Sequence, residues 1–303
     1  MLTRSLMAVS ENPRIRSLIE DHRLSRPVVD RFVAGAGLED AVRAIAKMNR
    51  SGIGGILDLL GEGVTNPQGA SEAADEYLAS IKRIEETGID TTVSIKLTQL
   101  GLAFDKAGCI DYVHRLATEA KSIGTYIEID MEQSDFVGDT IDVYRTLRAD
   151  FDDIRLAMQA YLRRTPADLQ AMADLHPKVR LIKGAYSEPP EVAVQKKGEI
   201  DAQFAWLTDW LIANGRDPAI GTHDGKLIDH CISTARRSGV GKDGFEVQLL
   251  YGIRRDLQQR LAAEGYRTRV YVPFGSAWYP YLMRRMAERP ANLRFFLRAL
   301  AGD

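Results

Sequence analysis

Two adjacent arginines and a glutamate, Arg284, Arg285 and Glu288, follow the last strand-like run of this chain. Neighbouring positions on a helix point about 100° apart, so two guanidinium groups can reach one planar anion from different sides. Glu288 lies on the same helix face and can orient both arginines. These residue types at this spacing are suited to holding a carboxylate, although a solvated, salt-bridged helix would have the same pattern.

Polar side chains also lie at or just after the carboxyl ends of most of the other strand-like runs. A structural barrel could end its strands in serine, asparagine or glycine, whereas this chain gathers lysines, an aspartate and a histidine there. The sequence therefore predicts a binding or catalytic site where these ends meet. In chain order the residues are Glu62, Lys96, Asp130, Gln159, Tyr161, Lys183, Tyr186, Thr222, His223, Asp224, Gln248 and Tyr271.

Eight apolar, β-rich runs alternate with helix-like stretches and would position these side chains. The runs are 55–61, 92–97, 126–130, 154–159, 179–183, 219–223, 245–250 and 269–272. The helices expected between them are 71–87, 110–123, 140–147, 166–175, 193–213, 226–238 and 254–264. Strict alternation predicts parallel strands with right-handed crossovers, and eight such units close into an α/β fold, the (βα)8 TIM-type barrel. We expect an N-terminal helical extension over 1–50 and the barrel with a C-terminal helix over 51–303.

The composition is that of an ordinary globular protein, with 303 residues, 45% apolar residues, 27% charged residues and a formal net charge of −2. Acidic and basic residues are mixed along the chain without a polybasic run, which argues against nucleic acid as a partner. Cys109 and Cys231 are far apart and lack the spacing of metal ligands. We therefore expect reduced thiols, with a disulfide as the alternative, and no metal site.

The sequence predicts a cytoplasmic protein, because no segment reaches the roughly 18 apolar residues of a membrane span and no secretory signal is recognisable. The stretch 293–300 is nevertheless apolar at helical spacing. Packing against the barrel is the first interpretation of this stretch. A peripheral contact with the inner face of the membrane is the second.

The chain resembles the bacterial monofunctional proline dehydrogenases and the corresponding domain of bifunctional proline-utilisation flavoenzymes. The resemblance extends from about residue 56 to residue 292. It rests on motifs that occur in the expected order, each on its expected strand. They are Leu60-Gly61-Glu62, Ser94-Ile95-Lys96-Leu97-Thr98, Glu128-Ile129-Asp130-Met131-Glu132, Gln159-Ala160-Tyr161, Arg180-Leu181-Ile182-Lys183-Gly184-Ala185-Tyr186, Thr222-His223, Gln248-Leu249-Leu250, and Tyr271 with Arg284, Arg285 and Glu288.

The resemblance implies a noncovalent FAD cofactor and no Rossmann motif. The implied reaction is oxidation of L-proline to Δ1-pyrroline-5-carboxylate by hydride transfer to flavin N5, with a membrane quinone as the electron acceptor. A downstream pyrroline-5-carboxylate/glutamate-semialdehyde dehydrogenase would be a further partner. Matched by motif, the cofactor-binding residues are Gln159, Arg180, Ile182, Lys183, Gly184, Ala185, Thr222, His223 and Asp224.

The resemblance also assigns a proline site. Arg284 and Arg285 would hold the proline carboxylate, with Lys96 beside it. The ring pocket would be lined by Ala185, Tyr186, Leu250 and Tyr271. The catalytic set would be Lys96, Asp130, Tyr186, Tyr271, Arg284, Arg285 and Glu288.

Strand geometry qualifies two of these assignments. Arg180 and Lys183 are three residues apart on one strand, so they point to opposite faces, and we rank Arg180 first as a flavin contact. Lys96 and Asp130 come from neighbouring strands and could form an ion pair, contact the substrate, or do both. Asp224 stands where the family pattern has asparagine, which leaves that cofactor contact open.

Other functions remain open at this point. A Schiff-base lyase or aldolase could use a desolvated lysine, Lys96 or Lys183, as a nucleophile. Another flavin-barrel reductase would have no need of a paired-arginine carboxylate site. A barrel that only binds or regulates is the non-enzymatic alternative, and it would not need so many polar strand ends.

Overall fold

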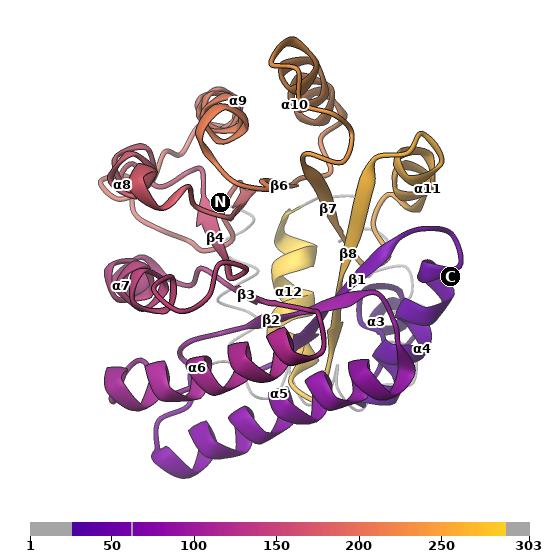
Figure 1. Ribbon diagram of the computed structural model, residues 1–303, viewed down its shortest axis with the longest axis vertical. Helices are drawn as coiled ribbons and strands as arrows, with labels where there is room; N and C mark the ends of the chain where they lie inside the picture. Colours follow the sequence, from indigo (N-terminus) through magenta and orange to yellow (C-terminus); the bar gives the residue numbers. More distant parts are fainter. Residues whose placement is uncertain (1–25, 62, 289–303) are drawn as a thin grey trace.

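A closed barrel of eight parallel strands forms the body of the protein, with the strands in chain order around it (Figure 1). The computed structural model describes residues 26–61 and 63–288, and the side chains of 26–28 and 284–288 lie outside that description. The predicted barrel is thus confirmed. Its strands are β1 (Gly54–Leu59), β2 (Thr91–Ile95), β3 (Ile127–Ile129), β4 (Arg155–Gln159), β5 (Val179–Ile182), β6 (Ala219–Gly221), β7 (Glu246–Leu250) and β8 (Arg267–Phe274).

Helices surround the barrel and connect each strand to the next. They are α5 (Pro67–Thr87), α6 (Lys106–Ser122), α7 (Val137–Leu147), α8 (Thr165–Ala171), α9 (Lys197–Asn214), α10 (Gly225–Arg237) and α11 (Arg255–Ala263), with short 3-10 turns at Ser134–Phe136 and Ala173–Leu175. Within the described residues, no helix is both long and apolar enough to cross a membrane.

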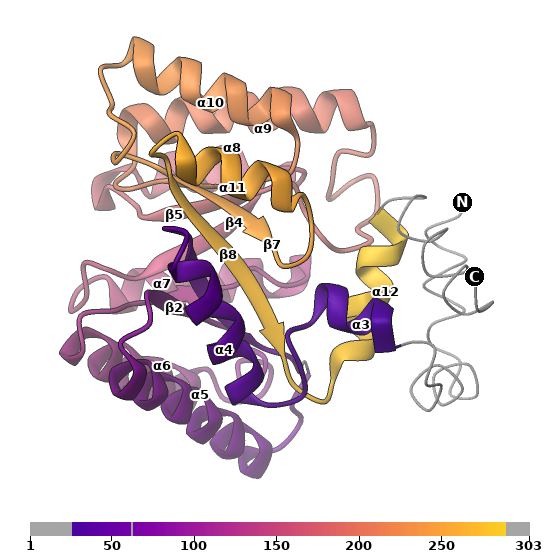
Figure 2. The same cartoon turned by 90° about the vertical axis from the view of Figure 1, so that its right-hand side faces the viewer.

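Among the residues that the structure describes, two helices precede the barrel and one follows it: α3 (Arg26–Phe32), α4 (Leu38–Asn49) and α12 (Trp278–Glu288). Figure 2 shows α3 and α12 side by side beyond the end toward which the arrows of β7 and β8 point. Phe32, Val33, Leu60, Tyr279 and Leu282 form a separate apolar cluster there. The helical extension is therefore seen from residue 26 onward, while the domain boundary at residue 50 stays a prediction.

Several predicted boundaries are wrong by a few residues, and specific contacts explain two of them. β6 ends at Gly221 rather than at residue 223 because the Thr222 hydroxyl accepts a hydrogen bond from the backbone N–H of Asp224, which turns the chain. Helix α9 begins at Lys197 rather than at residue 193 because Ala193 pairs with Leu162 in an isolated antiparallel bridge.

The barrel interior is polar, because the strands alternate buried polar and buried apolar residues. Arg155 of β4 reaches Glu246 of β7, and Gln248 of β7 reaches Glu128 of β3. These strands are not neighbours in the barrel, so such side chains must cross its interior. Buried charges are stable only when they are paired, and the interior is accordingly organised into charged clusters.

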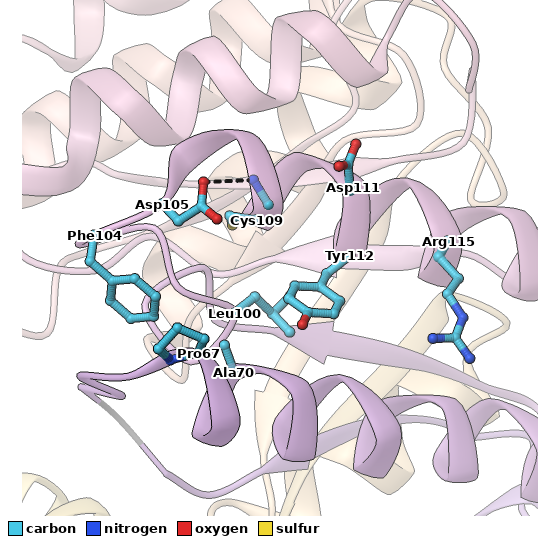
Figure 3. A pocket seen from close by; sticks show the side chains of 10 residues that line it. Pro67, Ala70, Leu100, Phe104, Asp105, Cys109, Asp111, Tyr112 and Arg115 are labelled. Atoms are coloured by element: carbon cyan, nitrogen blue, oxygen red, sulfur yellow. Dashed lines mark hydrogen bonds between the residues drawn. The ribbon is translucent and has the colours of Figure 1, made fainter.

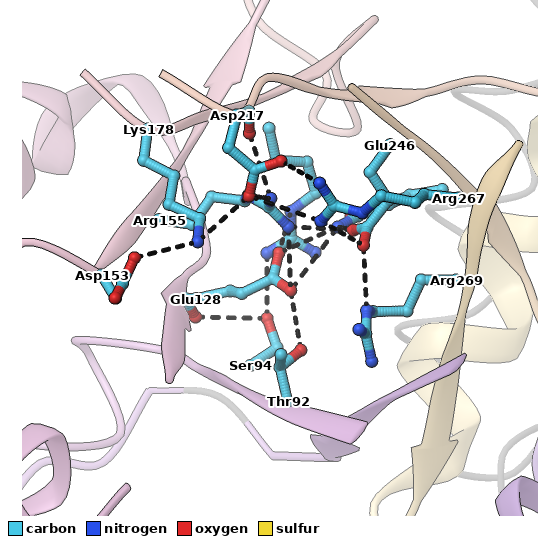
Figure 4. A network of polar contacts seen from close by, with 12 residues as sticks. Thr92, Ser94, Glu128, Asp153, Arg155, Lys178, Asp217, Glu246, Arg267 and Arg269 are labelled. Carbon is cyan, nitrogen blue, oxygen red and sulfur yellow. Dashed lines mark hydrogen bonds and ion pairs between the residues drawn. The ribbon is translucent and has the colours of Figure 1, made fainter. Parts of the chain in front are cut away.

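One of these clusters lies at the amino ends of the strands, and we call it the basal cluster (Figure 4). Its members are Arg155, Lys178, Asp217, Glu246, Arg267 and Arg269. Arg155 donates to Glu246 Oε1 and to Asp217 Oδ2, both at 2.9 Å. Burial alone would raise the pKa of Glu246, but the charges of Arg155 and Arg269 outweigh it and hold that pKa well below its usual range. Glu246 therefore stays ionised.

Candidate active site

A second charged cluster lies at the carboxyl ends of the strands, where barrel enzymes place their sites. Lys96 follows β2, and its Nζ is 2.5 Å from Asp58 Oδ1 and 3.3 Å from Asp130 Oδ2. Asp58 lies on β1 and Asp130 directly after β3, so the lysine bridges the strands on either side of its own. The ion pair of Lys96 with Asp130, one of the two outcomes considered from the sequence, is thus present.

Arg180 of β5 and Tyr271 of β8 complete this group. Arg180 Nη2 donates to Asp130 Oδ1 at 2.7 Å and to Ser94 Oγ at 3.0 Å. The Tyr271 hydroxyl donates to Asp130 Oδ2 at 2.6 Å, and the Arg180 guanidinium lies 5.3 Å from the centre of the tyrosine ring. We call Asp58, Ser94, Lys96, Asp130, Arg180 and Tyr271 the rim cluster.

The ionisation states of the rim cluster follow from its contacts. Burial would lower the pKa of Lys96, but the negative charges of Asp58 and Asp130 raise that pKa well above its usual value. Burial would raise the pKa of Asp130, but Arg180 and Lys96 lower it. The pKa of Tyr271 is raised well above its usual value by burial and by Asp130. At neutral pH the cluster therefore offers an ammonium, a carboxylate and a neutral hydroxyl.

Gln159, a predicted cofactor residue, joins two loops beside this cluster. Its Nε2 donates to the backbone carbonyl of Glu132 at 2.9 Å, and its Oε1 accepts from the backbone N–H of Ala185 at 3.1 Å. Gln159 is fully buried. Both ends of the amide are thus engaged by backbone, so this residue positions the segment that contains Ala185.

The segment from Gly184 to Tyr186 is fixed by Tyr161. Gly184 has a φ of 135°, and a Cβ placed there would come within 2.2 Å of the Tyr161 ring. The Tyr161 hydroxyl donates to the backbone carbonyl of Tyr186 at 3.2 Å. Only glycine suits this position, both for its φ and for the close approach of the ring.

Lys183 lies on the other side of β5 from Arg180, as the alternation of side chains predicts. Its Nζ is 2.5 Å from Asp201 Oδ1 on α9 and 3.3 Å from Asp224 Oδ2. Asp224 also caps α10 by accepting a hydrogen bond from the backbone N–H of Lys226. Arg180 therefore belongs to the barrel interior, whereas Lys183 belongs to a salt-bridge group on the surrounding layer.

Three further predicted residues, His223, Ile182 and Leu250, lie at the same end of the barrel. His223 Nε2 accepts a hydrogen bond from the backbone N–H of Leu250 at 2.9 Å, which ties the end of β7 to the loop after β6. Ile182 and Leu250 are half-buried at the ends of β5 and β7. Arg284, Arg285 and Glu288 lie on α12, but their side chains, like residue 62, are outside the described part of the chain.

Sequence reasoning missed Asp58, Ser94 and Glu128, which are all fully or almost fully buried. Asp58 forms an ion pair with Lys96, and Ser94 accepts a hydrogen bond from Arg180. The Glu128 carboxylate lies 3.6 Å from Arg180 Nε. A polar residue at every second position of an otherwise apolar strand was the available signal, because such residues must share the barrel interior.

A separate hollow of about 370 Å³ lies between α5 and α6 (Figure 3). Leu100, Phe104, Tyr112 and Arg115 are among the residues that line it. No member of the rim cluster is among them, so this hollow is distinct from the candidate site.

Comparison with known proteins identifies the family. A family model described as proline dehydrogenase matches residues 41–298. A proline dehydrogenase from Deinococcus radiodurans is 38% identical over 302 residues, which cover 98% of this chain and 97% of the relative. Proline dehydrogenase 1 from Bacillus subtilis strain 168 is 35% identical over 300 residues, 99% of each chain.

Among solved structures, proline utilization A from Bdellovibrio bacteriovorus, inactivated by N-propargylglycine, matches with a TM-score of 0.82 at 22% identity. The match covers 87% of this chain and 33% of that one, so this chain corresponds to about a third of the larger protein. The structural likeness supports the fold alone. With the family model and the full-length relatives, the conclusion is that the chain belongs to the proline dehydrogenase family and is an oxidoreductase of that class.

Proposed function

We propose that this member of the proline dehydrogenase family carries out the first step of proline catabolism, the oxidation of L-proline to Δ1-pyrroline-5-carboxylate. The observation that carries the proposal is the rim cluster. It holds a protonated lysine, a neutral tyrosine hydroxyl and an ordered arginine together at the carboxyl ends of the strands. Relatives that match this chain over nearly its whole length are proline dehydrogenases.

The residues present fit a flavin, and we propose noncovalent FAD. Arg180 is a buried cation that its hydrogen bonds to Asp130 and Ser94 hold in place within the rim cluster. It would place positive charge where electron density develops when a flavin is reduced. Other holding residues would be Gln159, Ile182, Lys183, Gly184, Ala185, Thr222, His223 and Asp224. When bound, the flavin would supply the acceptor for the hydride that proline loses.

The contact of Lys183 with the cofactor is limited by the carboxylates around it. It is already paired with Asp201 and Asp224, and Lys197 also contacts both carboxylates. A cofactor phosphate would therefore compete with two aspartates for these lysines. This competition favours a contact of Lys183 with the cofactor that is weaker than that of Arg180.

The substrate site would combine an anion-binding end with an apolar and aromatic wall. Arg284, Arg285 and Lys96 would hold the carboxylate, and Glu288 would orient the arginines. Ala185, Tyr186, Leu250 and Tyr271 would enclose the ring and exclude water. Asp130 would keep Lys96, Arg180 and Tyr271 in place through the contacts described above, so that its role is to orient rather than to accept a proton from carbon.

The state of Lys96 argues against the Schiff-base alternative. A nucleophilic lysine needs a lowered pKa, whereas the carboxylates of Asp58 and Asp130 raise the pKa of Lys96. Lys183 is paired with two carboxylates as well. Neither lysine has the desolvated, uncompensated surroundings that such chemistry requires.

Electrons would leave the reduced enzyme for a membrane quinone, and the product would pass to a pyrroline-5-carboxylate/glutamate-semialdehyde dehydrogenase. A peripheral membrane contact through 293–300 stays a prediction, since that stretch lies outside the described residues. Both partners follow from the family resemblance and the proposed chemistry.

An absorption spectrum tests the proposal directly. The purified protein, supplemented with FAD if necessary, should show an oxidised flavin spectrum that anaerobic L-proline bleaches. Borohydride in the presence of a carbonyl substrate should trap no adduct. Failure to bind FAD, or trapping of a lysine adduct, would remove this function and favour the lyase.

A further inference from the structure

Glu128 lies between the two charged clusters of the barrel. It is the middle residue of β3 and is fully buried. Its Oε1 accepts from the Thr92 hydroxyl at 2.7 Å, and its Oε2 accepts from Gln248 Nε2 at 3.1 Å. Thr92 therefore fixes the carboxylate from β2, the neighbour of β3, and Gln248 fixes it from β7, across the barrel interior.

Two arginines approach this fixed carboxylate, one from the basal cluster and one from the rim cluster. Arg155 Nη1 is 3.5 Å away, and Arg180 Nε is 3.6 Å away. Arg155 already has hydrogen bonds at 2.9 Å to Glu246 and to Asp217, so its charge is compensated within the basal cluster.

Arg180 depends on Glu128 more strongly. Asp130 and Ser94 both receive their hydrogen bonds from Nη2. The Nε edge is buried and makes no hydrogen bond among the described residues, and the Glu128 carboxylate is the counter-charge beside it. Glu128 on β3 and Asp130, two residues further along the chain, thus hold the guanidinium from two sides.

We infer that Glu128 is a positioning residue that fixes Arg180 and partly neutralises its charge, so that it sets the electrostatic potential at the flavin. The inference rests on the proposed function, because it takes Arg180 to lie at the flavin. An isolated cation in a poorly solvated site favours any process that places negative charge next to it. The Glu128 carboxylate, on the side of Arg180 away from the flavin, would weaken this preference for negative charge.

The test uses the full-length, FAD-loaded protein and measures sulfite binding, because sulfite forms an anionic adduct at flavin N5 that bleaches the visible absorbance. Glu128→Gln keeps the shape of the side chain and can still accept from Thr92, but it removes the charge. The sulfite dissociation constant should fall on the order of tenfold, since a unit charge in a poorly solvated site, at an effective dielectric constant near 20, has an effect of this size over a separation of several side chains. The flavin midpoint potential should rise as well.

Asp217→Asn is the matched control. It removes one carboxylate charge from the basal cluster at the opposite end of the same barrel. Asp217 has a φ of 47°, a conformation that asparagine also adopts readily. This variant should bind sulfite as the wild type does.

Glu128→Asp provides a second variant should the glutamine variant fail to fold. It keeps the charge but withdraws it from Arg180, and the sulfite dissociation constant should fall by roughly two- to threefold. Wild-type sulfite affinity in a folded, flavin-containing Glu128 variant would overturn the inference, and so would equal tightening in Asp217→Asn. A wild-type protein that binds no FAD would instead contradict the proposed function itself.

Discussion

The basal and rim clusters are both buried networks of charge inside one barrel, but they use their hydrogen bonds differently. In the basal cluster, arginine side chains also bind backbone carbonyls: Arg155 that of Asp217, Arg267 that of Asp243, and Arg269 that of Gly55. In the rim cluster, the side-chain bonds of Lys96, Asp130 and Arg180 run to other side chains. The basal cluster therefore joins loops and strands, whereas the rim cluster orders functional groups.

The two clusters show how one barrel separates stability from chemistry. Cations that bind backbone carbonyls hold the amino ends of several strands together, and their loss should affect folding. Cations that bind only side chains can adjust to a substrate or cofactor without moving the backbone. The division agrees with the general arrangement of barrel enzymes, in which the amino end serves stability and the carboxyl end serves catalysis.

Replacing Arg155 by methionine should have the largest effect on stability. Arg155 is fully buried, and its removal would leave Glu246 and Asp217 short of a counter-charge. Breaking a buried ion pair in this way typically costs about 3–5 kcal/mol of unfolding free energy. Urea unfolding followed by circular dichroism measures it. A loss below about 1 kcal/mol would show that the basal cluster does not hold the barrel together.

Replacing Lys96 by methionine should instead act on catalysis. The loss of a charged donor at the rim should lower kcat/KM for proline on the order of a hundredfold per bound flavin. The loss of stability should be smaller than for Arg155→Met, because Asp130 keeps its bond to Arg180 at 2.7 Å and Asp58 can take up a proton. Steady-state oxidation with a soluble dye and urea unfolding measure both effects. Unchanged turnover together with a large stability loss would contradict the division between the clusters.

The fold could be predicted from the sequence because each strand carries its own apolar pattern and each helix its own period. The relative faces of Arg180 and Lys183 could be predicted for the same local reason, and the structure confirms them through their separate partners. The ends of β6 and α9 could not, since they depend on a hydroxyl contact and on a bridge between distant segments.

The partners within the site depend on information that one strand does not contain. Lys96 meets Asp58 because β1 and β2 are in a register that pairs Asp58 with Ser94, two residues before the lysine. Glu128 reaches Gln248 because the sheet closes, which brings β3 opposite β7. Register and closure are set by packing around the whole barrel, so the sequence indicated which residues are polar but not which of them meet.

Replacing Lys106 by methionine should have the smallest effect and completes a series of three cation-to-methionine variants. Lys106 joins α6 to α7, with Nζ 2.7 Å from Asp139 Oδ1 and 2.8 Å from Asp142 Oδ2. These distances match those of the basal cluster, but the side chains are 36%, 50% and 62% exposed. Solvent and salt screen such pairs, so we expect a change in unfolding free energy below about 1 kcal/mol that shrinks further in 1 M salt. Urea unfolding at low and high salt measures it. If Lys106→Met cost as much as Arg155→Met, the number of ion pairs rather than their burial would determine the stability of this barrel.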